Sequence, residues 1–298
     1  MAANPAAAVP TADAPVARGG RVRRGARRLL RNPLSAIGLA FAIGFVAIAI
    51  AAPLLAPMDP LAMNPGGRLA EPSAAHWLGT DDGGRDVLSR LIHGTRSSLL
   101  AALGILTLAT AIGTAVGLTA GYFGGWIDEI LMRLTDMFLA FPALVLAMGM
   151  AAALGPSLIN AVLATALVWW PWYARLVRGQ TLQLKTEAFV EAARIAGASG
   201  PRIAVRHILR NCWTPITVQM SLDVGYAILT LSGLSFIGLG AQPPTPEWGS
   251  MVSIGRDYFL EQWWLVTCPG VAIFLSVMAF NLLGDGLHEA FSPRLARG

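Results

Sequence analysis

The chain has 298 residues, of which 55% are hydrophobic and 13% are charged. A soluble domain of this length is not so apolar, so the composition excludes that class and predicts a membrane protein with several spans. The formal net charge is +5, and the basic residues cluster beside apolar runs, which favours membrane topology over nucleic-acid binding. Cys212 and Cys268 have no CxxC spacing and indicate neither a metal site nor a disulfide framework.

Residues 1–32 are predicted to form a basic cytoplasmic tail, because seven arginines between Arg18 and Arg31 directly precede an apolar run. Residues 33–56 form the first predicted transmembrane helix, since at 1.5 Å per residue they are long enough for a hydrocarbon core of ~30 Å. The run exceeds a signal-peptide core and lacks a clear cleavage site, so we expect an uncleaved anchor.

Residues 57–96 are predicted to be an extracytoplasmic loop with a short interfacial helix at 86–93. Gly79, Thr80 and the pair Gly83-Gly84 predict a turn within this loop. The loop contains four candidate metal ligands, which are Asp81, Asp82, Asp86 and His93. Their spacing fits no known ligand pattern, and two nearby arginines, Arg85 and Arg90, are expected to pair with the acids, so no metal site is predicted.

Residues 97–287 are predicted to be the core membrane domain, followed by a cytoplasmic tail at 288–298. Its five expected spans are 97–123, 131–154, 157–177, 213–240 and 263–287. In the first of these, Gly113, Gly117 and Gly121 form overlapping GxxxG pairs, which predict a close helix crossing. The third span of the chain, 131–154, contains Pro142. The fourth contains the aromatic run 169–173, for which helix packing or an interfacial belt is favoured over a substrate platform.

Residues 187–210 form a polar island between two apolar runs and are predicted to fold as a helical hairpin within a loop that spans 180–212. A first short helix is expected at 187–196, where no Gly or Pro occurs. Gly197 occupies the position of a helix C-terminal glycine, and Pro201 suits the start of a second helix. Arg202, Arg206 and Arg210 recur every four residues and share one face of that helix.

The distribution of arginine orients the chain. The N-terminal tail, the hairpin and the C-terminal tail are rich in arginine, whereas the loops on the other side mix arginines with more acidic residues. By the positive-inside rule both termini and the hairpin are cytoplasmic.

The hairpin resembles the EAA loop of ABC importer permeases: EAARIAG is followed by ten residues and then by IL. In that family the loop forms a coupling helix that docks in a groove of a cytoplasmic ATPase subunit. The matching positions, which the resemblance assigns to ATPase coupling, are Glu191, Ala192, Ala193, Gly197, Ile208 and Leu209. The chain departs from the pattern at Arg210, where the family usually has proline.

Three further stretches resemble the dipeptide, oligopeptide and nickel branch of these permeases, and most of all the dipeptide permease "C" subunits. The stretches are LGTDDGGRDVLSRLIHGTRSSL, GLSFIGLGAQPPTPEWGSM and NLLGDGLHEAFSPRL. The chain departs again at Leu231, where many relatives have an acidic residue. The resemblance implies an all-α membrane protein with six transmembrane helices and the type I ABC importer permease fold, placed in the bacterial inner membrane. It also implies three kinds of partner: a homologous second permease as heterodimer partner, two ATPase subunits or domains, and an extracytoplasmic solute-binding protein.

Active transport requires an energy source, and this sequence contains no GxxxxGK[ST] phosphate loop, because its only lysine, Lys185, follows Leu184. ATP and Mg are therefore expected on partner subunits, and the chain is expected to carry no cofactor, no metal and no catalytic residue. The four histidines are scattered over both sides, which disfavours a membrane-embedded enzyme. An ion-coupled secondary transporter is a further alternative that would use a buried charge such as Asp223, but it leaves the hairpin without a role.

Peptides are the favoured substrates, and nickel chelates, glutathione-like compounds and glycosides remain alternatives. Gln219, Asp223 and Tyr226 lie on one helix face and are predicted to face the translocation cavity, where the carboxylate could balance a peptide ammonium group. The alternative for Asp223 is an interhelical hydrogen bond or a salt bridge to the partner permease.

The loop 241–250 contains three prolines within four residues and is expected to be ordered. Pro243, Pro244 and Trp248 are predicted to contact the binding protein, with Trp248 as the anchor. An equally open alternative is a rigid cap that packs on the permease itself.

Overall fold

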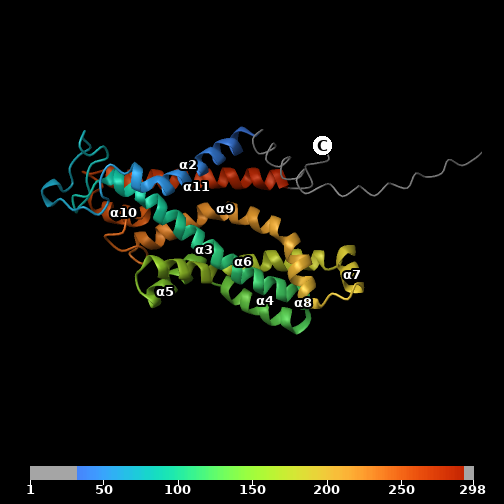
Figure 1. The fold of residues 1–298 in the computed structure, drawn as a ribbon. Helices are drawn as coiled ribbons and strands as arrows, with labels where there is room; N and C mark the ends of the chain where they lie inside the picture. Colours follow the sequence, from blue (N-terminus) through green and yellow to red (C-terminus); the bar gives the residue numbers. More distant parts are fainter. Residues whose placement is uncertain (1–31, 292–298) are drawn as a thin grey trace, which may run out of the picture.

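The computed structural model describes residues 32–291, and every regular element in that range is a helix (Figure 1). An isolated bridge between Thr80 and Asp86 is the extended pairing found there, and it closes the turn predicted from the loop glycines. The predicted N-terminal arginine cluster and Arg294 and Arg297 of the C-terminal tail lie outside the described residues.

The helices follow one another along the chain with short connections. They are α2 (Pro33–Leu55), the 3-10 turn η1 (Pro65–Gly67), α3 (Val87–Phe123), α4 (Gly125–Leu139), α5 (Ala143–Leu154), α6 (Leu158–Leu184), α7 (Ala188–Ile195), α8 (Gly200–Arg202), η2 (Ile203–Ile208), α9 (Leu209–Phe236), α10 (Trp248–Gly255), η3 (Arg256–Tyr258) and α11 (Trp264–Phe291).

Within the described residues, α2, α3 and α11 are long and apolar enough to cross a membrane, and the bent pair α4–α5 makes a fourth candidate. α6 and α9 have 27 and 28 residues, so their length suffices, but they are less apolar. Six spans therefore remain a prediction, whereas the all-helical fold class is confirmed for residues 32–291.

The predicted break between an interfacial helix at 86–93 and a span beginning at 97 is wrong, because α3 is one helix of 37 residues. Asp86 starts it, since its carboxylate accepts a 2.8 Å hydrogen bond from the backbone N–H of Ser89. No proline interrupts the helix, and Gly94 is needed inside it because a Cβ there would lie 2.9 Å from Cδ1 of Trp248.

The predicted span 131–154 is not one straight helix, because α4 and α5 meet at 89°. Pro142 caps the start of α5, and proline lacks the N–H that would continue α4. The residue before a proline is also driven out of the helical region, which explains why the helix ends at Leu139.

α3 and α6 cross at close range, as the GxxxG pairs predict. A Cβ on Gly113 would lie 2.5 Å from the carbonyl oxygen of Trp170, and one on Gly121 would lie 2.8 Å from Cβ of Thr181. These distances leave no room for a side chain, so the glycines permit the backbone contact. α11 lies along α2 and α9 on the other side of α3 (Figure 1).

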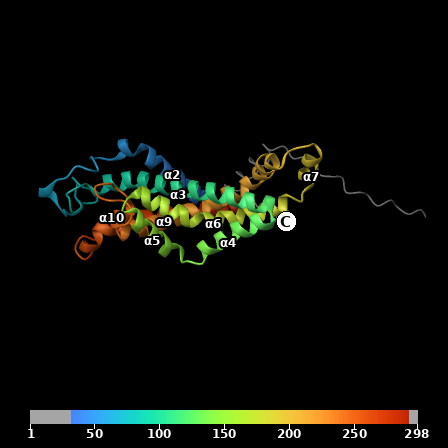
Figure 2. The same ribbon diagram turned by 90° about the horizontal axis from the view of Figure 1, so that it is seen from below.

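The hairpin projects from one end of the molecule, and α10 with the loop 57–86 lies at the other end (Figure 2). α7 ends as predicted, because Gly197 has a φ of +78°, a left-handed conformation that favours glycine. The second predicted helix is not separate from the following span: α8 continues through the π-helical segment η2 into α9. Val190 of α7 is buried in a cluster with Ile203 and Ile208, which fixes the hairpin to the start of α9.

Candidate functional site

Three polar residues predicted to share a face of α9 do line one cavity of about 520 Å³. They are Gln219, Asp223 and Tyr226, and they lie at positions i, i+4 and i+7 of the helix. The remaining walls come from α5 and α6. Those lining residues are Ala143, Trp169, Trp172, Tyr173 and Leu176.

Asp223 is held by two neutral donors. The hydroxyl of Tyr173 donates a 2.7 Å hydrogen bond to Oδ2, and the Gln219 amide donates a 3.0 Å bond to Oδ1. A carboxylate has about four lone-pair sites, so each oxygen keeps the capacity to accept another bond. The carboxyl group thus lines this cavity and also joins α6 to α9 within this chain, so the interhelical hydrogen bond is present, and the place of Asp223 in a translocation path stays a prediction.

The aromatic run 169–173 divides between two environments. Trp169, Trp172 and Tyr173 line the cavity. Trp170 is buried instead, with its ring centroid 5.4 Å from that of Phe138 in α4. The predicted role in helix packing is therefore confirmed for Trp170, whereas its neighbours in the run form a wall of the cavity.

Ion pairs fix the bent pair α4–α5 against α6. Arg178 donates to both carboxylate oxygens of Asp128, at 2.6 and 2.7 Å, and Arg175 donates to Asp136 at 2.6 Å. A bidentate guanidinium–carboxylate pair also fixes the orientation of the two side chains relative to each other. These pairs join α4 to α6 ahead of the turn into α5, whose first residue is Ala143. The sequence offered no signal for them, because the partners lie 50 and 39 residues apart.

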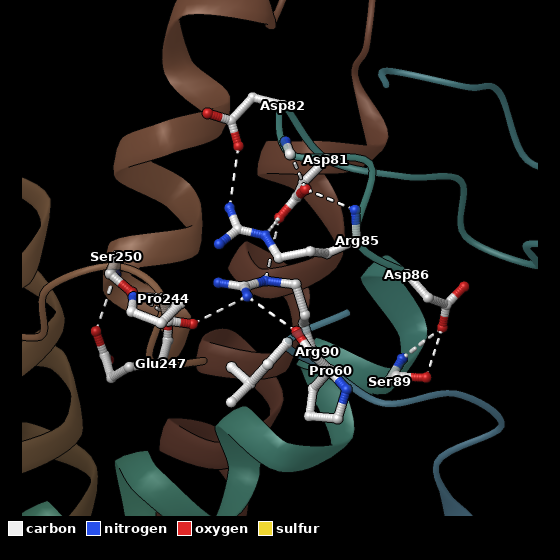
Figure 3. A network of polar contacts seen from close by, with 12 residues as sticks. Pro60, Asp81, Asp82, Arg85, Asp86, Ser89, Arg90, Pro244, Glu247 and Ser250 are labelled. Carbon is white, nitrogen blue, oxygen red and sulfur yellow. Dashed lines mark hydrogen bonds and ion pairs between the residues drawn. The ribbon is translucent and has the colours of Figure 1, made fainter. Parts of the chain in front are cut away.

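At the other end of α3, a network of buried charges joins the loops (Figure 3). Oδ2 of Asp81 accepts a 2.8 Å hydrogen bond from Nε of Arg85 and lies 3.2 Å from Nε of Arg90. Arg85 also pairs with Asp82 at 3.2 Å. The prediction that Arg85 and Arg90 pair with the loop acids is confirmed.

Arg90 connects two loops that are far apart in sequence. Its Nη1 donates 3.1 Å hydrogen bonds to the carbonyl oxygens of Pro60 and Pro244, and its side chain is 1% exposed (Figure 3). Asp86 caps α3 through its Oδ2, and its Oδ1 lies 3.0 Å from Nδ1 of His76. Within residues 32–291 no group of three metal-binding side chains forms, and His93 is half-buried on α3.

Trp248 is not an exposed anchor, so that part of the binding-protein prediction is wrong. Its side chain is 0% exposed, and its Nε1 donates a 3.1 Å hydrogen bond to the carbonyl oxygen of Leu91. Its ring meets that of Phe45 edge-on at 5.9 Å. The segment from Glu247 onward is therefore a cap packed on the chain itself, while Pro243 and Pro244 remain exposed.

Glu247 starts α10 from inside this cap. Its carboxylate accepts 2.9 Å hydrogen bonds from the backbone N–H groups of Gly249 and Ser250. The hydroxyl of Ser98 in α3 donates a further bond of 3.3 Å. Burial raises the pKa of the Glu247 carboxyl, because desolvation outweighs these bonds. The sequence gives no hint that this acid is buried.

The predicted coupling residues separate into an outward group and an inward group. Glu191, Ala192 and Gly197 are exposed, Ala193 is half-buried, and a Cβ on Gly197 would meet no atom within 4 Å. Ile208 is buried and Leu209 half-buried against the hairpin. The sequence missed Ile195, an apolar side chain on α7 that is 81% exposed.

Residues 113–297 match the family described as "Binding-protein-dependent transport system inner membrane component", and residues 21–72 match "N-terminal TM domain of oligopeptide transport permease C". The chain is 47% identical to the probable D,D-dipeptide transport system permease protein DdpC of Escherichia coli strain K12, over 88% of each chain. It is 45% identical to the dipeptide transport system permease protein DppC of Alkalihalophilus pseudofirmus, over 92% of this chain and 90% of that one.

A third relative is the glutathione transport system permease protein GsiD of Pectobacterium atrosepticum, at 45% identity over 90% of each chain. Among solved structures, the fold is similar to a chain of the inward-facing MetNI methionine ABC transporter. That match has a TM-score of 0.55 and 18% identity, and it covers 69% of this chain and 98% of the other.

Proposed function

Because the chain belongs to the family of binding-protein-dependent transport system inner membrane components, we propose that it is a permease subunit of an ATP-driven importer of di- and oligopeptides. It forms half of the translocation pathway and pairs with a homologous second permease. The observation that carries this function is α7, a short helix at one end of the molecule with an exposed surface of Glu191, Ala192, Ile195 and Gly197.

In the proposed topology the six spans are α2, α3, the bent pair α4–α5, α6, α9 and α11, in the inner membrane with both termini cytoplasmic. The opposite placement of the hairpin and of α10 supports this orientation (Figure 2). The arginines of the hairpin support it as well, since Arg202, Arg206 and Arg210 are all exposed.

In the proposed mechanism α7 docks in a groove of a cytoplasmic ATPase subunit. Small residues at Ala192 and Gly197 allow that partner's backbone to approach, and Ile195 supplies apolar area. The buried contacts of Val190 with Ile203 and Ile208 tie α7 to α8 and η2. Since these segments continue into α9 without a loop, a displacement of α7 moves the helix that carries Asp223.

ATP and Mg are bound by the ATPase subunits in this proposal, and the chain itself needs no cofactor, metal or catalytic residue. Glutathione is the second candidate substrate, because a relative of equal identity is named for its transport. On the extracytoplasmic side, the exposed Pro243 and Pro244 are proposed contacts for the solute-binding protein, held in place through the bond from Arg90 to Pro244.

The test is whether the chain, purified from its native membrane, retains ATPase subunits. The wild-type chain is expected to retain them, and Ile195→Asp is expected to lose most of them because a charge replaces the exposed apolar contact. Leu260→Asp is the matched control, since Leu260 is 97% exposed in the loop at the opposite end. The proposal fails if the wild type retains no ATPase, or if the two variants lose it equally.

A further inference from the structure

We infer that the cavity at Asp223 is a subsite for the ammonium group of the substrate, with Asp223 as counter-charge and Trp169 and Trp172 as aromatic walls. The inference rests on the proposed import function and adds the chemistry that the pathway recognises. It concerns a passing contact, because Trp172 and Tyr226 are 60% and 58% exposed and leave the site open.

The charge of the cavity lining favours a cation. Asp223 is the charged residue among the eight that line the cavity, and no lysine, arginine or histidine is in the lining set. Its hydrogen-bond partners, Tyr173 and Gln219, are uncharged. The carboxylate is therefore oriented but not neutralised. A charge within a membrane helix is costly unless it meets water or a countercharge, so a substrate cation is favoured there.

The aromatic wall of the cavity also favours a cation. Indole and phenol rings attract cations within about 6 Å through their quadrupoles, and tryptophan does so best. Trp169, Trp172 and Tyr226 line the same cavity as the carboxylate. An ammonium group that loses part of its hydration in this cavity is therefore stabilised both by the carboxylate and by the aromatic rings. An anionic substrate group gains nothing here, because the lining residues supply no positive charge.

The volume of the cavity and the fixed position of Tyr173 suit a small-molecule site. The cavity volume of about 520 Å³ lies within the 300–1,000 Å³ typical of small-molecule sites. Tyr173 is 1% exposed and fixed in the α3–α6–α9 core, so it is a positioning residue that sets where the carboxylate points. The wall and the carboxylate come from two helices, α6 and α9, so a relative movement of these helices would disassemble the subsite.

The experiment uses the complete importer, with both permeases, the ATPase subunits and the binding protein. Tetramethylammonium chloride is titrated against the tryptophan fluorescence of the purified complex, with sodium chloride as the salt control. The inference predicts a saturable change with tetramethylammonium that is lost in Asp223→Asn and retained in Asp223→Glu. Equal responses in the wild type and Asp223→Asn overturn it.

Uptake of radiolabelled dialanine in proteoliposomes is the second readout. Asp223→Asn is expected to lower dialanine transported per ATP hydrolysed about tenfold, which is the scale of about 1.4 kcal/mol, while ATPase stimulation by the binding protein persists. Asp223→Glu keeps the charge and is expected to retain uptake close to that of the wild type. If both variants lose uptake equally, the charge is not what matters and the inference is wrong.

Trp172 provides a variant that does not threaten folding, because its side chain is 60% exposed. Both Trp172→Phe and Trp172→Leu remove the same indole from the fluorescence signal, so the two variants are compared by their concentration of half-maximal response. Trp172→Phe keeps a ring face and is expected to respond at an about threefold lower tetramethylammonium concentration than Trp172→Leu. Equal responses in the two variants contradict the aromatic part. Wild-type complexes without ATP-dependent uptake would contradict the proposed function, while the fluorescence titration still decides the subsite.

Discussion

The hydroxyl of Tyr173 donates a 2.7 Å hydrogen bond to Oδ2 of Asp223 and joins α6 to α9 inside the cavity. The same two helices reach the hairpin, since α6 leads into α7 and α8 leads through η2 into α9. The bond therefore lies between the arms that α7 connects. We therefore expect a movement of the hairpin to change the geometry around this pair.

Tyr173→Phe is predicted to lower the free energy of unfolding by about 1 kcal/mol, because the half-buried carboxyl group of Asp223 loses one hydrogen bond. We expect lower dialanine uptake as well, since Asp223 loses the group that orients it. Tyr226→Phe is the control, because Tyr226 lines the same cavity but is 58% exposed. Thermal unfolding in detergent measures the effect. Equal losses in the two variants would show that the bond has no special role.

Gly197→Leu is predicted to abolish retention of the ATPase subunits while the chain still inserts in the membrane. The φ of +78° strains any side chain at this position by about 1–2 kcal/mol, and the leucine would also occupy an open surface. Gly197→Ala carries the same strain with little bulk, so it separates strain from a steric clash. Wild-type retention and transport in Gly197→Leu would contradict docking at this surface.

Arg90→Met is predicted to lower the free energy of unfolding by about 1–3 kcal/mol, because the carbonyl oxygens of Pro60 and Pro244 lose their charged donor. Asp81 would keep its bond to Arg85, but the links to Pro60 and Pro244 would be lost. Limited proteolysis of the loops 57–86 and 241–247 reports the change. Arg90→Lys keeps the charge but not the forked geometry, so we expect partial protection. Unchanged proteolysis in Arg90→Met would contradict a linking role.

Glu247→Gln tests the buried acid by its pH dependence. Burial raises the folded-state pKa above the ordinary 4.5, so the folded chain holds the proton more tightly than the unfolded chain. Stability is then present below that ordinary value and is lost as pH rises through the raised pKa. The Tm of the wild type should fall relative to Glu247→Gln from about pH 4.5 upward. A Tm difference that is constant with pH would contradict the assignment.

Local chemistry made part of the structure predictable from the sequence. Gly197 ends α7, the glycines of α3 meet α6, and Arg85 and Arg90 pair with Asp81, because each of these depends on short-range spacing or on one dominant residue type. The polar stripe of α9 follows equally from helical period.

The features that the sequence did not predict depend on contacts between residues far apart in the chain. Trp248 is buried by Phe45 and Gly94, which lie more than 150 residues away in the chain. Because the local sequence around Trp248 does not reveal these contacts, it predicts an exposed anchor. The ion pair of Asp128 with Arg178 also depends on a long-range approach. Pro142 was visible in the sequence, but whether it kinks or breaks a span is decided by how α4 packs on α6.

We propose above all that this chain conducts substrate on energy supplied by separate ATPase subunits. Accumulation of radiolabelled dialanine in proteoliposomes that hold the complete complex, with ionophores present to collapse ion gradients, tests it most directly. We predict accumulation that requires ATP on the side of the hairpin and disappears when the ATPase subunits are omitted. Accumulation driven by a proton or sodium gradient without those subunits would contradict the claim and identify a secondary transporter.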